Sequence, residues 1–234
     1  SSSIQVGEYI LTKIGSNYED GMLIKYNKEG KIEWATSVGG NGREQIEAVS
    51  LTSDGGVIAG GHFSSSSIQV GDYTLINNNN SSYDGMVIKY SADGKVEWAN
   101  NIGGQDSVEI HSISSTNDGG IIVGGYFRGG SIQAGDYTLT NSGGYDGMII
   151  KYNAEGEIKW AKSIAGDSHD YIYSVASSSD GGAIVGGIFY SSSIQVGEYT
   201  LTNKGGSYSD GMLIKYNASG EVEWAASIGG SNSD

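Results

Sequence analysis

The sequence predicts an all-β fold made of repeated antiparallel sheets, and three observations support this prediction. The chain has 39 Gly but no Pro among its 234 residues, so its turns must be made with glycine. Its 16 Tyr accompany many Ile and Val, which are residue types typical of strands. One segment recurs four times along the chain with few changes. Helical periodicity is absent, so we expect no helices.

Composition and charge exclude several classes of protein. With 27 acidic and 13 basic residues the net charge is −14, which disfavours nucleic acid and anionic membranes as partners. No apolar stretch approaches the roughly 18 residues of a membrane span, so we predict no membrane insertion. The absence of Cys excludes disulfides, thiolate zinc sites and cysteine nucleophiles. The chain begins without a signal peptide, which is typical of a mature or shortened chain.

The internal repeat sets the organisation of the chain. The motif S-I-Q-[VA]-G starts at Ser3, Ser67, Ser131 and Ser193, and D-G-M starts at Asp20, Asp84, Asp146 and Asp210. Successive copies of the first motif are 64, 64 and 62 residues apart. We therefore predict a single repeat domain over residues 1–234, with units at about 1–64, 65–128, 129–190 and 191–234, the last one truncated.

Each unit is expected to contain two core hairpins. In the first, residues 21–38, Gly30 takes the left-handed position of a type I turn followed by a G1 bulge. That turn pairs Tyr26 with Ile32 and places Lys25 opposite Glu33, an opposite-charge pair. The same pair recurs at Lys89 with Glu97 and at Lys215 with Glu223.

The second core hairpin bends at a D-G-G turn that starts at Asp54, Asp118 and Asp180. Its second strand contains the glycine pairs Gly60-Gly61, Gly124-Gly125 and Gly186-Gly187. Adjacent glycines weaken a strand unless backbones must approach closely, so we expect neighbouring sheets to converge there. The Ser- and Asn-rich connection that carries S-I-Q reads as an exposed excursion, or as a third short hairpin bent at Gly-Asp or Gly-Glu.

Two hairpins give four core strands per unit, and four-stranded sheets repeated radially are the blades of a β-propeller. Apolar residues on both faces of these strands require cover on both sides, as neighbouring blades provide. We predict a β-propeller of four-stranded antiparallel blades, about 64 residues per repeat, with three and a half to four blades in this chain. A β-solenoid is the alternative, although its coils usually repeat at shorter periods.

The repeated residues also carry a resemblance to a known family. The pattern D-G-M-[LVI]-I-K-Y-[NS]-x-x-G-x-[IV]-x-W-A, followed by the D-G-G hairpin, resembles the bacterial β-propeller repeats called SBBP repeats. The resemblance covers essentially the whole chain, although the longer S-I-Q connection departs from it. It implies a bacterial protein that is extracellular or displayed on the cell surface. It implies no catalytic residues.

The ends of the chain predict an incomplete ring. Ser1 corresponds to Ser191 and Asp234 to Asp170, so the four units together lack one core hairpin, equivalent to residues 171–190. Either the chain is part of a longer array, or the hairpin comes from another chain or from a continuation of this one. The second possibility predicts assembly, because an unpaired sheet edge recruits partner strands.

No catalytic constellation stands out, so we predict a protein that is not an enzyme. His62, His111 and His169 occupy different repeat positions and lack metal-ligand spacing, so we assign them surface or loop roles. The repeated aspartates are expected to bind backbone N–H groups in turns. Calcium is the rival reading, but no D-x-D-x-D loop appears. We predict no metal site and no cofactor.

Aromatic residues provide the remaining candidates. The strand tryptophans are predicted to form structural core: Trp34, Trp98, Trp160 and Trp224. In the exposed connection, a Tyr and a Gln recur together, and a ring beside an amide suits contact with glycan or protein. These ligand-binding candidates are Gln5, Tyr9, Gln69, Tyr73, Gln133, Tyr137, Gln195 and Tyr199. The alternative is that they only complete the packing of the connection.

The sequence thus favours a secreted or cell-surface module for binding or adhesion, with glycan or protein held by repeated exposed loops. The alternative is a structural subunit of an extracellular filament or surface layer, in which copies of the chain join through open sheet edges.

Overall fold

A computed structural model describes residues 2–15, 18–77 and 82–232. These ranges contain 22 strands and no helix, which confirms the predicted all-β class. Within the same ranges, therefore, no helix is available that is long and apolar enough to cross a membrane.

Three four-stranded antiparallel sheets form the body of the molecule. Each combines the D-G-G hairpin of one sequence unit with the D-G-M hairpin of the next, so every sheet crosses a unit boundary. Sheet 1 contains β5 (Glu44–Leu51), β6 (Val57–Phe63), β9 (Asp84–Tyr90) and β10 (Val96–Gly104). Sheet 2 contains β11 (Val108–Ser115), β12 (Ile121–Phe127), β15 (Asp146–Tyr152) and β16 (Ile158–Ile164). Sheet 3 contains β17 (Asp170–Ser177), β18 (Ala183–Phe189), β21 (Asp210–Tyr216) and β22 (Val222–Ile228).

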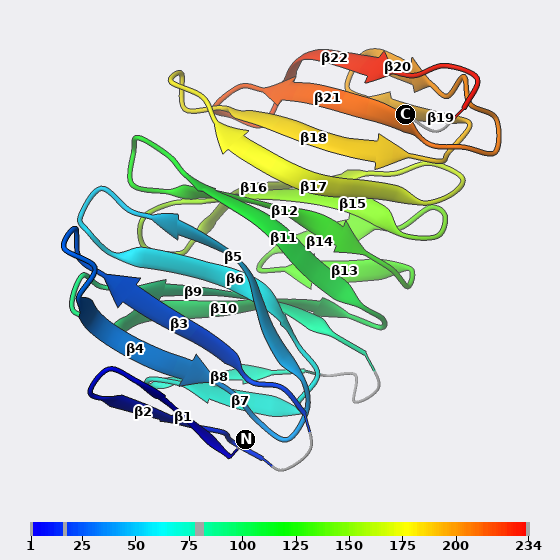
Figure 1. Ribbon diagram of the computed structural model, residues 1–234. Helices are drawn as coiled ribbons and strands as arrows, with labels where there is room; N and C mark the ends of the chain where they lie inside the picture. The colour runs from blue at the N-terminus through cyan, green and yellow to red at the C-terminus, as the bar shows by residue number, and fades with distance from the viewer. Residues whose placement is uncertain (1, 16–17, 78–81, 233–234) are drawn as a thin grey trace.

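A two-stranded sheet precedes these three. It consists of β3 (Gly21–Tyr26) and β4 (Ile32–Val38), which pair with each other. The sheets stack face to face along the chain, and the two termini lie at opposite ends of the stack (Figure 1). The first strands of the three complete sheets, β5, β11 and β17, lie against one another in sequence order.

The glycine pairs set how closely the sheets stack. A Cβ added to Gly60 would overlap the Ile113 side chain of the next sheet, and one added to Gly124 would overlap that of Val175. A Cβ on the second glycine of a pair, such as Gly61, would collide with the carbonyl oxygen of the partner strand. The predicted close approach is therefore confirmed.

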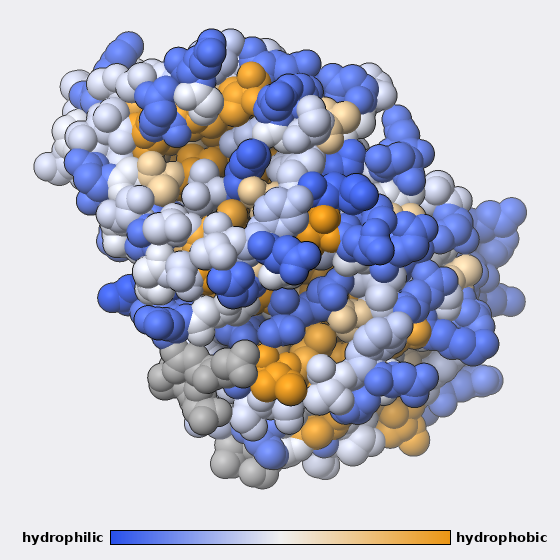
Figure 2. All heavy atoms as spheres, turned by 180° about the vertical axis from the view of Figure 1, so that it is seen from behind, coloured by the Kyte–Doolittle hydropathy of each residue, from blue (hydrophilic) through white to orange (hydrophobic). Residues whose placement is uncertain are grey.

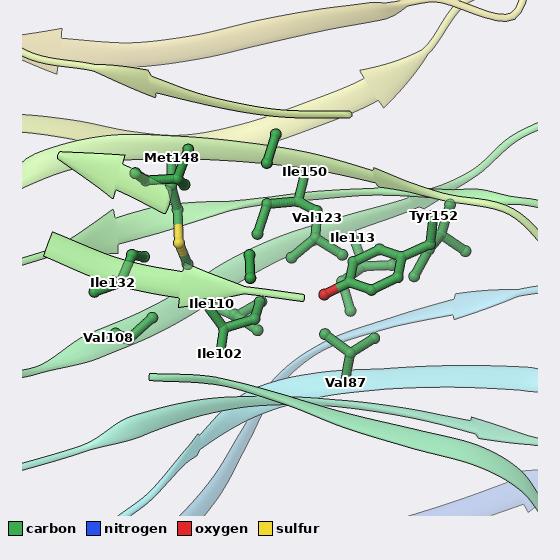
Figure 3. Close-up of a cluster of buried hydrophobic side chains, with 14 of the residues drawn as sticks. Val87, Ile102, Val108, Ile110, Ile113, Val123, Ile132, Met148, Ile150 and Tyr152 are labelled. Atoms are coloured by element: carbon green, nitrogen blue, oxygen red, sulfur yellow. The ribbon is translucent and has the colours of Figure 1, made fainter. Parts of the chain in front are cut away.

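The space between sheets is filled by apolar side chains. Between sheets 1 and 2, Val87 and Ile102 face Ile110, Met148 and other apolar residues (Figure 3). Toward the outer strands, three of the four tryptophans each stack on a Tyr of the following sheet. Ring centroids are 5.7 to 6.0 Å apart in the pairs Trp34 with Tyr90, Trp98 with Tyr152 and Trp160 with Tyr216. These three tryptophans are buried, whereas Trp224 on the last sheet is 39% exposed.

The turn of the first hairpin forms as predicted, but its register differs by one residue. Gly30 has φ of 75°, and Tyr26 pairs with Ile32. A bulge then places Trp34, and not Glu33, opposite Lys25, so the predicted Lys25–Glu33 pairing is wrong. The bulge directs Glu33 sideways, and its carboxylate still lies 3.1 Å from the Lys25 ammonium. Equivalent ion pairs join Lys89 to Glu97 and Lys215 to Glu223.

The S-I-Q connections form short hairpins with a glycine bend, as one of the two readings predicted. They are β1 (Ser3–Val6) with β2 (Tyr9–Thr12), β7 (Ser67–Val70) with β8 (Tyr73–Ile76), β13 (Ser131–Ala134) with β14 (Tyr137–Thr140), and β19 (Ser193–Val196) with β20 (Tyr199–Thr202). Their turn glycines have φ between 55° and 60° at Gly7, Gly71, Gly135 and Gly197. β13 also pairs with β10, which extends sheet 1 to six strands and ties the hairpin to the preceding sheet.

The D-G-M aspartates hold the loops that enter the sheets. The carboxylate of Asp146 accepts a hydrogen bond of 2.6 Å from the Ser142 amide, and that of Asp210 accepts one of 2.8 Å from the Lys204 amide. Asp84 and Asp146 are buried, and burial raises the pKa of both side chains to about 6.

We predict that Gly124→Ala destabilises the protein, because the new methyl group would overlap Val175 and push sheets 2 and 3 apart. The expected loss is about 1–3 kcal/mol of unfolding free energy. Gly186→Ala is the matched control, since the nearest atom to its Cβ is 4.0 Å away on Leu213. That variant should change stability by less than about 1 kcal/mol. Urea unfolding measures both, and equal effects would contradict the stacking role.

We also predict that the protein becomes more stable as the pH falls from 7.5 to 5. The pKa of Asp84 is about 6 in the folded state against 3.8 for the ordinary group, so the folded state takes up protons first. Asp84→Asn should reduce this gain, which is at most about 1.4 kcal/mol per pH unit for one group. Thermal unfolding at pH 7.5 and pH 5 measures this increase in stability, with the exposed Asp72→Asn as the control. If Asp84→Asn shows the same increase in stability as the unchanged protein, the prediction is wrong.

Candidate functional site

The tyrosines predicted to bind ligand bridge each short hairpin to an outer strand of the core. Their hydroxyl groups donate to backbone carbonyls at 2.5 to 2.7 Å: Tyr9 to Glu33, Tyr73 to Glu97, Tyr137 to Lys159 and Tyr199 to Glu223. Each ring remains partly exposed. The four tyrosines lie one per unit along the stack and do not converge.

The glutamines beside them bond within their own hairpins. Gln5, Gln69 and Gln195 donate to the carbonyls of Gly7, Gly71 and Gly197, and Gln133 donates to the Thr138 hydroxyl. Gln133 and Tyr137 line a groove of about 740 Å³ beside β10 and β16. Gln69 lines another of about 400 Å³ beside β4 and β10. Ligand binding at these residues stays a prediction.

A second candidate site emerges where the repeats differ from one another. The three D-G-G hairpins are nearly alike from residue 48 to residue 61 and at the equivalent positions of the later copies. At one end of the hairpin, however, several positions hold three different residues each, including a set of five. In repeat order these are Arg43, Ser107 and His169; Gln45, Glu109 and Tyr171; Glu47, His111 and Tyr173; His62, Tyr126 and Ile188; Ser64, Arg128 and Tyr190.

The fold brings many of these residues together along one edge of the stack. A bulge at residue 47, 111 or 173 interrupts each first strand beside a cross-strand pair, and bulges re-aim side chains. The pairs are Gln45 with His62, Glu109 with Tyr126, and Tyr171 with Ile188. We call the resulting surface the aromatic edge: Gln45, His62, Tyr83, Glu109, His111, Tyr126, Tyr145, His169, Tyr171, Tyr173 and Tyr190.

On sheet 1, His62 is the centre of the aromatic edge. Its Nε2 lies 3.0 Å from Oε1 of Gln45, and its ring meets that of Tyr83 edge-on at 4.7 Å. The side chain is 5% exposed, so the predicted surface role of His62 is wrong. Burial lowers the pKa of His62, and the nearby Glu109 carboxylate of the next sheet opposes this shift.

On sheet 2, three polar side chains are joined. The Tyr126 hydroxyl donates to Oε2 of Glu109 at 3.0 Å, and Nε2 of His111 lies 3.5 Å from the same oxygen. The rings of His111 and Tyr126 stack at 4.6 Å. The neighbouring His111 imidazole lowers the pKa of Glu109, whereas burial raises the pKa of Tyr126. Glu109 is therefore held as a carboxylate and Tyr126 as a neutral phenol.

On sheet 3, tyrosines continue the aromatic edge toward solvent. Tyr171 meets Tyr126 edge-on at 4.8 Å and stacks on Tyr173 at 5.8 Å with their planes 9° apart. Tyr173 is 48% exposed and Tyr190 is 37% exposed. The neighbouring loop adds Tyr145, whose ring lies 5.7 Å from that of His169.

Chemically, the aromatic edge offers rings, phenols and one carboxylate. Such a surface can stack on a partner, donate hydrogen bonds and attract a cation. The guanidinium of Arg128 already lies 5.8 Å from the Tyr145 ring centre. Within the described ranges, no cluster of three or more His, Asp and Glu side chains is arranged to hold a metal ion.

This site was not predicted from the sequence, because only residues that recur at equivalent repeat positions were considered candidates. The signal that indicates the site is variation: equivalent positions hold different residues, while the rest of the repeat stays nearly constant. Those positions fall at one end of the predicted hairpins, but the pairs of Gln45 with His62 and Glu109 with Tyr126 exist only because of the bulges at residues 47 and 111.

Comparison with known proteins gives two distant relatives. The chain is 24% identical over 233 residues to the uncharacterized WD repeat-containing protein L264 of Acanthamoeba polyphaga mimivirus, which covers 84% of this chain and 17% of that protein. It is 27% identical over 138 residues to the regulatory protein FlaEY of Caulobacter vibrioides, which covers 58% of this chain and 14% of that protein. A scan against models of known families finds no match. The chain thus spans less than a fifth of either relative, and the WD-repeat likeness indicates a repeat protein rich in β-structure.

Proposed function

We propose that the chain is a protein-interaction module of the β-propeller type, without catalytic activity, and that the aromatic edge is its binding face. One observation carries this proposal: the side chains that differ between repeats gather on one edge, whereas the frame that holds them is constant. A repeated scaffold that presents different residues at equivalent positions suits recognition of a partner that itself lacks the repeat.

The chemistry of the aromatic edge favours a protein segment with basic side chains. Tyrosine is enriched among the residues that contribute most to protein interfaces. Tyr173 and Tyr190 are exposed, and Tyr171 connects them to the carboxylate site of Glu109. A Lys or Arg of the partner can lie over these rings and approach this carboxylate. The net charge of −14 would attract such a segment over longer distances.

The fold supports the same reading. WD repeats form propeller blades of four strands, and the relative with 24% identity is a WD repeat-containing protein. Each of the three complete sheets in the described residues has a core of four antiparallel strands. Following the resemblance to SBBP repeats, we propose a secreted or cell-surface location, where binding would serve adhesion.

We predict that Tyr173→Ala combined with Tyr190→Ala weakens peptide binding at least tenfold. Both rings are substantially exposed, so the fold should persist, and loss of one interface tyrosine typically costs more than about 1 kcal/mol. The probe is an array of basic, acidic and neutral peptides, followed by titration of the strongest binder. Basic peptides should bind most tightly.

The matched control is Tyr73→Ala combined with Tyr137→Ala, which removes two hairpin rings. It should leave the peptide affinity unchanged. Loss of binding only in this control would place the ligand at the hairpins instead. Binding on a glycan array, with no peptide bound, would contradict the proposed class of partner.

A further inference from the structure

The edge of β3 lacks a neighbour that its three counterparts possess. β9 pairs with β6, β15 with β12, and β21 with β18, over seven residues in each case. β3 carries the same D-G-M sequence, yet among the described residues its pairing partner is β4 alone. Its other edge therefore presents backbone groups in the geometry that a further antiparallel strand would use.

Apolar side chains around this edge are uncovered in the same pattern. Val49 of β5 is 57% exposed, whereas its counterparts Ile113 and Val175 are 8% and 7% exposed because they pack on Gly60 and Gly124. Leu51, two residues further along β5, is 69% exposed. A strand with a glycine pair, added beside β3, would cover Val49 as the others cover its counterparts. Figure 2 shows that apolar side chains also reach the surface among polar ones on the face seen from behind.

A cavity marks where the end of that strand would lie. It measures about 370 Å³, and its lining includes Ile4, Leu11, Gly21 and Met22. Ile4 is 47% exposed, whereas its counterparts Ile68, Ile132 and Ile194 are at most 2% exposed. In those three places a phenylalanine packs in the same core cluster as the isoleucine: Phe63 with Ile68, Phe127 with Ile132, and Phe189 with Ile194.

The ion pairs of the strand lysines give independent evidence for a missing hairpin beside β3. The strand lysine of each complete sheet binds the aspartate of the D-G-G turn in the same sheet, at 2.7 to 3.2 Å: Lys89 with Asp54, Lys151 with Asp118, and Lys215 with Asp180. Lys25 is the counterpart in β3. It contacts Glu33 and the carbonyls of Gly55 and Ala92, but no aspartate among the described residues. The occupant of the site should therefore carry an aspartate at its turn.

We propose that β3, together with β1–β2 and the exposed face of β5, is an acceptor site for one further D-G-G β-hairpin. The second strand of this hairpin pairs with β3 in the register that joins β6 to β9. Its turn aspartate binds Lys25, its glycine pair lies against Val49, and its final phenylalanine fills the cavity beside Ile4. Within the described residues, the three D-G-G hairpins occupy sheets 1 to 3, and sheet 3 lies at the far end of the stack from β3 (Figure 1).

The test uses a synthetic, fluorescently labelled peptide with the sequence of residues 170–189, which contains Asp180, the pair Gly186-Gly187 and Phe189. Titration with the intact chain should give saturable one-to-one binding by fluorescence anisotropy. Phe189→Ala in the peptide should weaken binding at least tenfold, because the cavity stays empty. Lys25→Gln in the chain should weaken it severalfold, whereas exposed Lys31→Gln should have no effect.

Hydrogen exchange locates the bound peptide. Added peptide should slow amide exchange within residues 21–26 of the chain. Slowed exchange restricted to residues 210–216 would mean that the peptide replaces the chain's own hairpin in sheet 3, and this would overturn the proposal. Absence of saturable binding, or binding indifferent to both Phe189→Ala and Lys25→Gln, would overturn it as well. The peptide carries Tyr171 and Tyr173 of the aromatic edge, so slowed exchange within residues 21–26 distinguishes binding at the acceptor site from contacts made by these two rings.

Discussion

Close stacking of one sheet on the next is the constraint on which the rest of this structure depends. It requires that a β-branched side chain of one sheet lie directly on the backbone of its neighbour, as Ile113 does on Gly60 and Val175 on Gly124. With the backbones this close, the outer strands also meet, and Trp98 can stack on Tyr152 while the short hairpins join adjacent sheets. Larger residues at the glycine positions would separate all of these contacts at once.

Much of this frame could be predicted from local sequence because local chemistry determines it. Gly30 has the positive φ that its turn position requires, and the short hairpins bend at Gly7 and its counterparts. The glycine pairs also predicted that neighbouring sheets approach each other closely. The register beyond Tyr26 could not be predicted in this way, because the bulge at Glu33 is a compromise between hairpin twist and the placement of Trp34 against the following sheet. Such a compromise involves residues far apart in the chain.

The candidate site was less accessible to sequence reasoning. His62, Glu109 and Tyr171 are separated by more than forty residues at each step, and only the stacking of three sheets places them along one edge. Their proximity also depends on bulges that no local motif announces. The tyrosines of the short hairpins attracted attention because they repeat, yet repetition is what structural residues share. Each of them donates its hydroxyl to the chain's own backbone.

The stacking distance also gives the aromatic edge a fixed spacing. Packed sheets lie roughly 10 Å apart, and an extended chain rises about 3.3 Å per residue. A segment lying straight across the three sheets would therefore pass from one sheet to the next about every three residues, although the ring centroids of Tyr126 and Tyr171 are only 4.8 Å apart. The glycines at the inner strands and the hairpin ties at the outer strands hold that interval constant. The aromatic edge would then select a partner by the distance between its side chains as well as by their chemistry.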